Sequence, residues 1–322
     1  MKQEPPPETR ALGDHLPSLD GIRGLAILLV ILHNTNPLGE PHSLATKALS
    51  FLADVGWVGV QLFFVLSGFL ITRILVATAG ASNYYSAFFG RRVLRIFPLY
   101  YGVLLAAFVI YPLAFGRSLE GHQYQVWLWT YLSNWASPYD HEVMAFPHFW
   151  SLAVEEQFYL VWPFVVRATA GSRGKGLVRV SVALAVIALV SRIALRAAGM
   201  GHAAPYSFTI CRIDALTLGA VAAVLSRDVS VLAWIEKRAR LLLGSVAGVL
   251  FLGALVTGGY ARIGLATQTA GYTLLAVAFA ILVLLAALDD SRGRKDGAYR
   301  WLHWRWLRTF GKYSYAMYVF HP

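Results

Sequence analysis

The sequence predicts an all-α protein, a polytopic bundle of transmembrane helices. Of its 322 residues, 57% are hydrophobic and 14% are charged, whereas soluble domains carry about 25% charged residues. Apolar stretches of about 20 residues, the length that crosses a bilayer, recur along the whole chain. Basic residues cluster between these stretches, as is typical of cytoplasmic loops. The net charge of +11 therefore reflects membrane topology, and we expect no nucleic-acid partner.

The apolar stretches predict about nine spans. A ninth span starts near residue 309 and reaches Pro322, so we expect a tenth span beyond the end of the chain and treat the domain as truncated there. The chain divides into a disordered cytoplasmic tail, 1–17, and one transmembrane domain, 18–322. The first eight spans are expected near 19–36, 55–78, 93–115, 149–168, 178–199, 208–225, 241–260 and 268–288.

The loop charges predict a cytoplasmic amino terminus. With that orientation, most Lys and Arg residues between spans fall on the inner side. The segment 124–136 is short and rich in Trp and Tyr, so we interpret it as an interfacial or re-entrant helix. Counting it as a full span would invert the loops that follow it.

Ionisable residues inside the predicted spans mark the candidate site, because such groups are costly in a bilayer. Arg23 and His33 occupy the first span, about 15 Å apart along a helix. Arg91, Arg92 and Arg95 lie at the inner mouth of the third span. They are either positive-inside anchors or a phosphate site, in which Arg91 and Arg95 share a helix face.

The fourth span opens with two adjacent carboxylates. A helix places Ser151, Glu155, Tyr159 and Trp162 on one face, and Glu156 about 100° away, where we expect more solvent. Glu155 therefore faces a polar cavity or pairs structurally, for which the candidate partners are Arg192 and Arg212.

The remaining polar residues of the spans favour structural roles. Arg212 and Asp214 are two residues apart, so they lie on different faces of the same helix. We therefore expect each to join a structural network with other helices. Ser67 lacks the G-x-S-x-G nucleophile motif, so we interpret it as helix packing beside Gly68. The histidines lack metal-ligand spacing and there is one cysteine, so we expect no metal site.

Several stretches together resemble the acyltransferase-3 family of bacterial integral-membrane O-acyltransferases. The resemblance runs in order along nearly the whole chain, which makes the set specific although each motif alone is weak. It rests on LDGIRGLAILLVILH (19–33), VGVQLFFVLSGFLITRIL (58–75), FFGRRVLRIFPLYY (88–101), FWSLAVEEQFYLVWP (149–163), RIDALTLG (212–219) and YSYAMYVFH (313–321).

The resemblance implies transfer of an acyl group, commonly acetyl, from cytoplasmic acyl-CoA to an extracytoplasmic hydroxyl. Acceptors in the family are mostly carbohydrates such as lipopolysaccharide O-antigen, exopolysaccharide and peptidoglycan. The implied location is the bacterial cytoplasmic (inner) membrane. The implied partners are acyl-CoA as donor substrate, a carbohydrate acceptor and the lipid bilayer, with no permanently bound cofactor.

Residue by residue, the resemblance assigns roles within the site. Arg23 and His33 match the first-helix pair of the family, and Glu155 matches the glutamate of its W-S-L-x-V-E-x-Q-F-Y pattern. Many members place the histidine eleven residues after the arginine, whereas here Asn34 holds that position. Either the helix register shifts locally, or His33 reaches the site from a neighbouring angle. The arginines expected to bind acyl-CoA are Arg23, Arg91, Arg92 and Arg95.

The predicted mechanism uses His33 and Glu155 as the catalytic pair. His33 acts as general base on the acceptor hydroxyl or is itself acylated, and Glu155 orients the imidazole or binds the acceptor. The alternative class is a proton-coupled transporter, in which the same ionisable residues form a relay. The residues expected to bind substrate are Trp150, Ser151, Tyr159 and His321.

Overall fold

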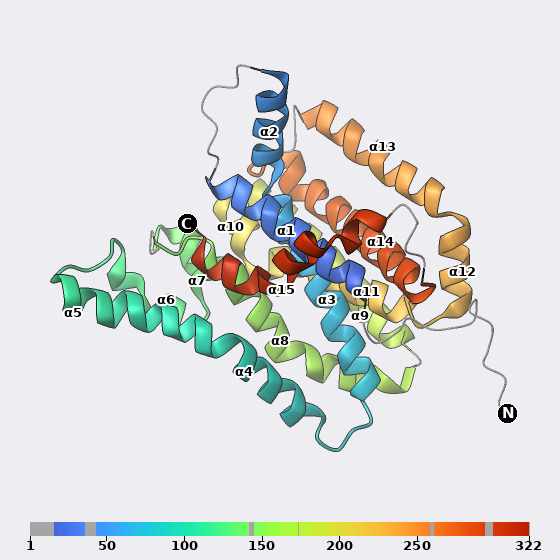
Figure 1. Ribbon diagram of the computed structural model, residues 1–322, viewed down its shortest axis with the longest axis horizontal. Helices are drawn as coiled ribbons and strands as arrows, with labels where there is room; N and C mark the ends of the chain where they lie inside the picture. Colours follow the sequence, from blue (N-terminus) through green and yellow to red (C-terminus); the bar gives the residue numbers. More distant parts are fainter. Residues whose placement is uncertain are drawn as a thin grey trace.

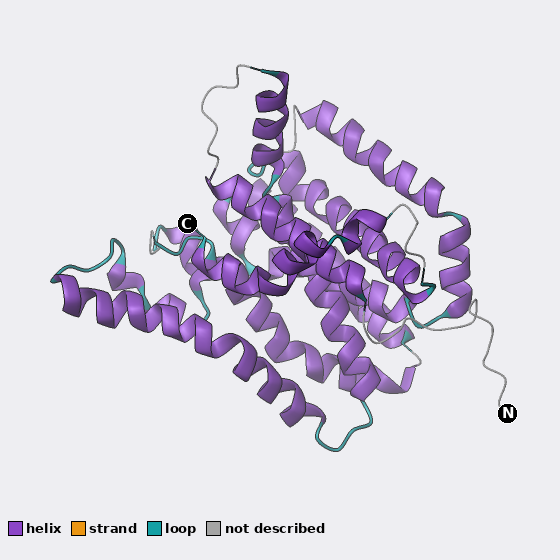
Figure 2. Ribbon diagram, in the orientation of Figure 1, coloured by secondary structure: helices purple, strands orange, loops and turns teal. Residues whose placement is uncertain are grey.

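The computed structural model is helical throughout the residues it describes, and no strand occurs among them (Figure 2). This confirms the all-α prediction. The described residues are 16–35, 43–141, 145–172, 174–257, 261–293 and 299–321, so the predicted tail lies outside them except for its last two residues. The longer helices are α1 (Pro17–Thr35), α2 (Leu44–Val55), α3 (Val58–Thr78), α4 (Tyr84–Leu105), α8 (Phe149–Thr169), α9 (Lys175–Ala197), α11 (Thr209–Leu225), α12 (Val229–Lys237), α13 (Ala239–Thr257), α14 (Tyr272–Ser291) and α15 (Arg305–Phe320).

Short helical turns connect these elements. The aromatic segment 124–136 contains two short α-helices, α6 (Val126–Trp129) and α7 (Ser133–Ala136). It therefore does not form one continuous helix. The other short elements are η2 (Ala106–Ile110), α5 (Tyr111–Phe115), η3 (His122–Tyr124), η4 (Ser137–Tyr139), η5 (Ala170–Ser172), α10 (Ala203–Ser207), η6 (Thr267–Gly271) and η7 (Arg300–His303).

The described residues include five helices long and apolar enough to cross a membrane. The bent pair α12 and α13, which turns by 67°, makes a sixth if it is one span. The predicted spans near 19–36, 149–168 and 309–322 coincide with α1, α8 and α15, which do not meet this criterion. These three helices carry charged or polar side chains along their length, and α15 has 16 residues. The count of nine spans is therefore not confirmed.

The bundle is organised around α1, α3, α11 and α15, with α4 and α13 at opposite edges in the view of Figure 1. The strongest packing joins α1 to α15, and α11 to both α3 and α9. The two ends of the chain that the sequence separates most, α1 and α15, thus lie side by side. This brings side chains of the first and last helices into one site.

Glycines permit the two closest helix crossings. A Cβ atom on Gly24 would lie 1.9 Å from the carbonyl oxygen of Leu307, so α1 and α15 touch through their backbones. A Cβ atom on Gly68 would lie 1.9 Å from the carbonyl oxygen of Leu216, which fixes α3 against α11. Small residues that allow such approach are a general device of membrane helix packing. Arg23 is next to Gly24 and is therefore placed beside α15. Ser67 is next to Gly68, where the backbone of α3 contacts that of α11.

Buried polar contacts lock the remaining helices in register. Trp162 of α8 donates a hydrogen bond of 2.8 Å from Nε1 to the hydroxyl of Thr72 on α3. Arg192 of α9 and Asp214 of α11 form an ion pair with an N–O distance of 2.9 Å, and both side chains are fully buried. Asp214 also accepts a hydrogen bond from Thr273 of α14 at 2.7 Å. The predicted structural network of Asp214 with other helices is therefore confirmed, and it joins α11 to both α9 and α14.

Candidate functional site

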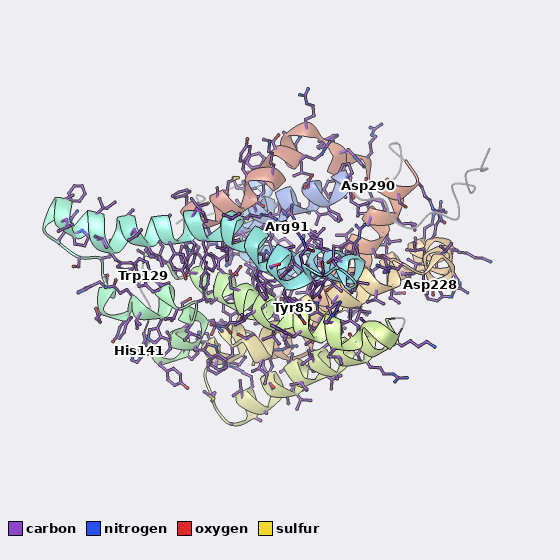
Figure 3. The ribbon with its side chains drawn as sticks, turned by 90° about the horizontal axis from the view of Figure 1, so that it is seen from below. Tyr85, Arg91, Trp129, His141, Asp228 and Asp290 are labelled. Atoms are coloured by element: carbon purple, nitrogen blue, oxygen red, sulfur yellow. The ribbon has the colours of Figure 1, made fainter. Side chains whose placement is uncertain are left out.

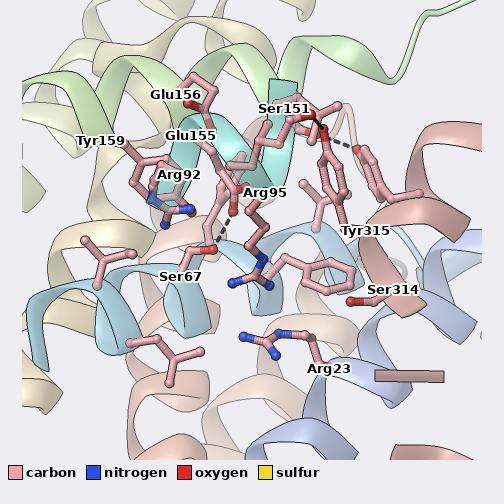
Figure 4. Close-up of a pocket in the computed structure, with 18 of the residues that line it drawn as sticks. Arg23, Ser67, Arg92, Arg95, Ser151, Glu155, Glu156, Tyr159, Ser314 and Tyr315 are labelled. Atoms are coloured by element: carbon pink, nitrogen blue, oxygen red, sulfur yellow. Dashed lines mark hydrogen bonds between the residues drawn. The ribbon is translucent and has the colours of Figure 1, made fainter. Parts of the chain in front are cut away.

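A cavity of about 320 Å³ lies inside the bundle, between α1, α3, α4, α8 and α15 (Figure 4). Its apolar walls come largely from α3, α4 and α8. Its polar lining combines cations, carboxylates and hydroxyls from helices that are far apart in the sequence. These polar residues are Arg23, Ser67, Arg92, Arg95, Ser151, Glu155, Glu156, Tyr159, Ser314, Tyr315 and Tyr318.

The face of α8 that the sequence predicts does line this cavity. Ser151, Glu155 and Tyr159 all contribute to the wall, as their spacing of four residues requires. Trp162 does not line it, since it is buried against α3. Glu156 also lines the cavity, so the two adjacent carboxylates share it, and the expectation that Glu156 has more solvent around it stays a prediction. The cavity is wide enough around α8 to include a residue about 100° from Glu155.

The carboxylate of Glu155 is hydrogen-bonded by Ser67, a residue that the sequence alone indicated only as part of helix packing. The hydroxyl of Ser67 donates a hydrogen bond of 2.6 Å to Oε1 of Glu155 (Figure 4). Arg92, Arg23 and Arg95 attract the same carboxylate electrostatically. The alternative that Glu155 pairs with Arg192 is wrong, because Arg192 bonds to Asp214. Ser67 is the functional candidate that the sequence missed. Its one signal was a hydroxyl in an otherwise apolar stretch of α3.

The arginine cluster of α4 divides between two environments. Arg92 and Arg95 line the cavity, whereas Arg91 on the surface of α4 does not (Figure 3). Arg92 is half-buried, and Arg91 and Arg95 are both exposed. The guanidinium carbon of Arg92 lies 3.4 Å from the ring centroid of Tyr159, which is a stacked cation–π contact. The spacing within α4 suggested that Arg91 and Arg95 act together. In the structure, the two arginines of α4 that line the cavity are Arg92 and Arg95.

The structure of α1 shows how the ten-residue spacing between Arg23 and His33 is accommodated. α1 is a continuous α-helix from Pro17 to Thr35, so its register does not shift between Arg23 and His33. His33 does not line the cavity, and its Nδ1 lies 2.7 Å from the carbonyl oxygen of Ala53 at the end of α2. The amide of Asn34 instead contacts Nε2 of His321 at 3.2 Å. The assignment of His33 as general base stays a prediction, from a position outside the cavity wall.

His321 belongs to a second polar cluster at the same end of the bundle. Its Nδ1 lies 2.6 Å from the carbonyl oxygen of Tyr318, and its ring centroid is 4.3 Å from that of His148. Burial and the neighbouring His321 ring lower the pKa of His148, just before α8, to about 3. The hydroxyls of Ser151 and Tyr318 are 2.5 Å apart and separate this cluster from the cavity.

Trp150 belongs to a third environment, around Arg212. The Arg212 side chain is 1% exposed, and its guanidinium lies among aromatic rings. Its nitrogens have no hydrogen-bond partner among the described residues. The distance from the guanidinium carbon to the ring centroid is 4.2 Å for Tyr272 and 5.6 Å for Trp150. Trp150 therefore packs on this cation and does not line the cavity, so its predicted contact with substrate stays a prediction. Within the described residues, no group of three His, Cys, Asp or Glu has the geometry to hold a metal.

The fold and the cavity define an all-helical integral membrane protein with a cation-lined internal site. The sequence model of a family described as an acyltransferase domain matches residues 16–322, and the chain belongs to this acyltransferase-3 family. The family is described as an acyltransferase domain, and the curated relatives are named as O-acetyltransferases. No solved structure matches the chain significantly.

Three curated relatives illustrate the similarity. The chain is 36% identical to peptidoglycan O-acetyltransferase OatA of Listeria monocytogenes over 48% of this chain and 25% of the relative. It is 34% identical to putative peptidoglycan O-acetyltransferase YrhL of Bacillus subtilis over 46% of this chain and 23% of the relative. It is 26% identical to O-acetyltransferase OatA of Staphylococcus aureus over 95% of this chain and 50% of the relative. The matches thus cover half or less of each relative's length.

Proposed function

We propose that the protein transfers an acetyl group from cytoplasmic acetyl-CoA to a hydroxyl of an extracytoplasmic cell-envelope glycan. The observation that carries the proposal is one cavity between the helices, lined by three arginines and two carboxylates. The arginines supply an anion site for the donor, and the carboxylates supply an acid–base group. The printed names of the relatives favour peptidoglycan as the acceptor, with O-antigen and exopolysaccharide as the other glycans to test.

The donor side of the proposal rests on charge and geometry. Coenzyme A carries several phosphate charges, and a guanidinium binds phosphate through paired hydrogen bonds. Arg23, Arg92 and Arg95 converge on the cavity from two helices, α1 and α4. Arg23 lies six residues from the start of α1, about 9 Å along the helix, so the donor enters from that end. In this proposal the positive-inside rule assigns this end to the cytoplasm, and the membrane is the bacterial inner membrane.

The acceptor enters from the opposite end in this proposal. Glu155 lies six residues after the start of α8, about 9 Å from that end of the helix. A carboxylate surrounded by hydroxyls and close to the reacting centre can take the proton of the attacking sugar hydroxyl. His33 and the cluster of His321 lie at this end of the bundle, where they are available to the acceptor.

The test is transfer by purified protein in lipid nanodiscs. We expect radiolabelled acetyl-CoA to yield labelled glycan when peptidoglycan fragments or other envelope glycans are supplied in turn. Glu155→Gln keeps size and hydrogen bonding but removes the base, so transfer should fall 10²- to 10⁴-fold while acetyl-CoA affinity changes little. Absence of acetyl-CoA binding, together with proton-coupled solute uptake into proteoliposomes, would instead support the transporter.

A further inference from the structure

We infer that Ser67 is the nucleophile of the reaction and carries the acetyl group as a covalent ester between donor and acceptor. This inference rests on the proposed function and deepens it. It replaces direct transfer from acetyl-CoA to sugar by two steps at one serine. The Ser67–Glu155 pair supplies the nucleophile and its base.

The hydrogen bond has the geometry of an activated nucleophile. Serine is a weak nucleophile unless a base within hydrogen-bond reach accepts its proton, and the distance from Ser67 Oγ to Glu155 Oε1 is 2.6 Å. Ser67 lines the cavity and is only partly buried, so a thioester carbonyl can approach it. The next residue, Gly68, fixes the backbone of α3 against α11. The hydroxyl is therefore presented from a rigid element.

The surrounding charges suit the transition state of acyl transfer. Arg92, Arg23 and Arg95 all act electrostatically on Glu155. Figure 4 shows the guanidinium groups of Arg92 and Arg95 beside the Ser67–Glu155 pair, with Arg23 beyond Arg95. Negative charge develops on the carbonyl oxygen when a hydroxyl attacks a thioester. Fixed cationic donors stabilise that charge and the departing thiolate, and they do so best where water is excluded. One set of arginines thus serves both the donor and the first chemical step.

The depth of Ser67 explains why an intermediate is useful. Along α3, Ser67 lies about 14 Å from Val58 and about 17 Å from Thr78, so it sits near the middle of a 21-residue helix. Coenzyme A is large and highly charged and stays on its own side, whereas an acetyl group is small. Loading a central serine moves the acetyl group half-way across. The acceptor then needs to reach only that serine from the other side.

The two steps balance. In the first, Ser67 Oγ attacks the thioester carbon, Glu155 takes the hydroxyl proton, the C–O bond forms and the C–S bond breaks. The proton passes from Glu155 to the thiolate, which leaves as coenzyme A thiol. In the second, Glu155 takes the proton of the sugar hydroxyl, whose oxygen attacks the ester carbon. Ser67 leaves with that proton, which restores the starting pair, and no oxidant or further reactant is required.

Apolar side chains line the same part of the cavity as Ser67. The cavity wall near Ser67 includes three side chains of α3, Phe63, Leu70 and Ile71. They can enclose a methyl group and limit access of water to the carbonyl, which would protect the ester from hydrolysis. The label should therefore persist when no acceptor is present.

The experiment incubates the full chain in nanodiscs with [1-¹⁴C]acetyl-CoA and no acceptor, followed by acid quenching and peptide mass spectrometry. We expect one acetyl group on Ser67, which is discharged when the acceptor glycan is added. Ser67→Ala should abolish both labelling and transfer. The matched control is Ser181→Ala, which removes a buried hydroxyl of α9 that has no hydrogen-bond partner among the described residues and should label normally.

A second variant keeps the result decisive if Ser67→Ala does not fold. Ser67→Cys retains a nucleophile, and its label should be a thioester that neutral hydroxylamine cleaves, unlike the wild-type ester. The inference is overturned if wild-type protein transfers acetyl without acquiring label, if label lies on another residue, or if Ser67→Ala transfers normally. Each of these outcomes leaves the proposed function intact. Failure of wild-type protein to use acetyl-CoA at all would overturn the proposed function itself.

Discussion

Replacing each arginine of the α4 cluster by lysine distinguishes anchoring from phosphate binding. Lysine keeps the positive charge, so a residue that only anchors the helix at the membrane surface should tolerate the change. A residue that binds phosphate loses its planar pair of donors. Because Arg92 and Arg95 line the cavity and Arg91 does not, we expect the three substitutions to differ.

The magnitude follows from the contacts that lysine cannot make. One charge-assisted hydrogen bond contributes about 1.5–3 kcal/mol, which corresponds to roughly 10- to 150-fold in affinity. Arg95→Lys should weaken acetyl-CoA binding toward the lower end of that range. Arg92→Lys should reach the upper end, because lysine also loses the planar stacking on Tyr159, where the distance is 3.4 Å. Arg91→Lys should bind as wild type does.

The assay is calorimetric titration of acetyl-CoA into each purified variant, with membrane abundance and thermal stability measured in parallel. Equal losses in all three variants would show that the cluster acts through placement of the α4 helix and not through contacts within the cavity. Unchanged affinity in Arg92→Lys and Arg95→Lys would return the cluster to an anchoring role. The donor site would then have to lie outside this cavity.

Three further predictions test the fold. Gly311→Ala should lower the melting temperature, because its Cβ atom would lie 1.8 Å from a backbone carbonyl oxygen of α1 and force the helix pair apart, at a cost of about 1–3 kcal/mol. Asp214→Asn should destabilise by about 3–5 kcal/mol, since it leaves the buried Arg192 uncompensated. Hydrogen bonds from the Ser230 hydroxyl and backbone amides lower the pKa of the exposed Asp228 from its ordinary value, so its contribution to stability is present at neutral pH and lost as pH falls through the folded-state pKa. Melting temperatures of wild type and Asp228→Asn should therefore converge in acid, and a constant difference across pH would contradict this reasoning.

Helix periodicity predicted much of the architecture and one face of the site. Apolar runs of about 20 residues located the long helices, and the four-residue spacing of Ser151, Glu155 and Tyr159 identified a face that lines the cavity. These features depend on a single helix and are therefore local. They are the part of the structure that one sequence encodes directly.

The features that the sequence missed depend on how separate helices are rotated against each other. Whether Arg91 or Arg92 accompanies Arg95 into the cavity is set by the rotation of α4 against α8, which no spacing within α4 specifies. The bond between Ser67 and Glu155 joins residues 88 positions apart, across two helices. It requires the exact placement of α3 that the backbone contact at Gly68 provides.

His33 provides a prediction that separates the two ends of the site. Its Nδ1 faces the carbonyl oxygen of Ala53, so the neutral ring donates there and keeps the Nε2 lone pair for a proton. His33 also lies about 15 Å beyond Arg23 along α1, away from the arginines that line the cavity. If Glu155 accepts the sugar proton, His33→Ala should therefore leave acetyl-CoA affinity unchanged and transfer to the glycan within a few-fold of wild type. A fall in transfer of 10²- to 10⁴-fold, the usual contribution of a general base, would instead identify His33 as the base for the sugar hydroxyl.

Arg92→Lys provides the comparison, because that variant should bind acetyl-CoA more weakly whereas His33→Ala should not. Thr35→Val, an exposed change at the same end of α1, controls for damage to that end of the helix. Transfer by His33→Ala within a few-fold of wild type would refute its role as base and leave Glu155 to accept the proton in both steps. A parallel loss of acetyl-CoA binding would show instead that His33 supports the donor site through the packing of α1 against α2.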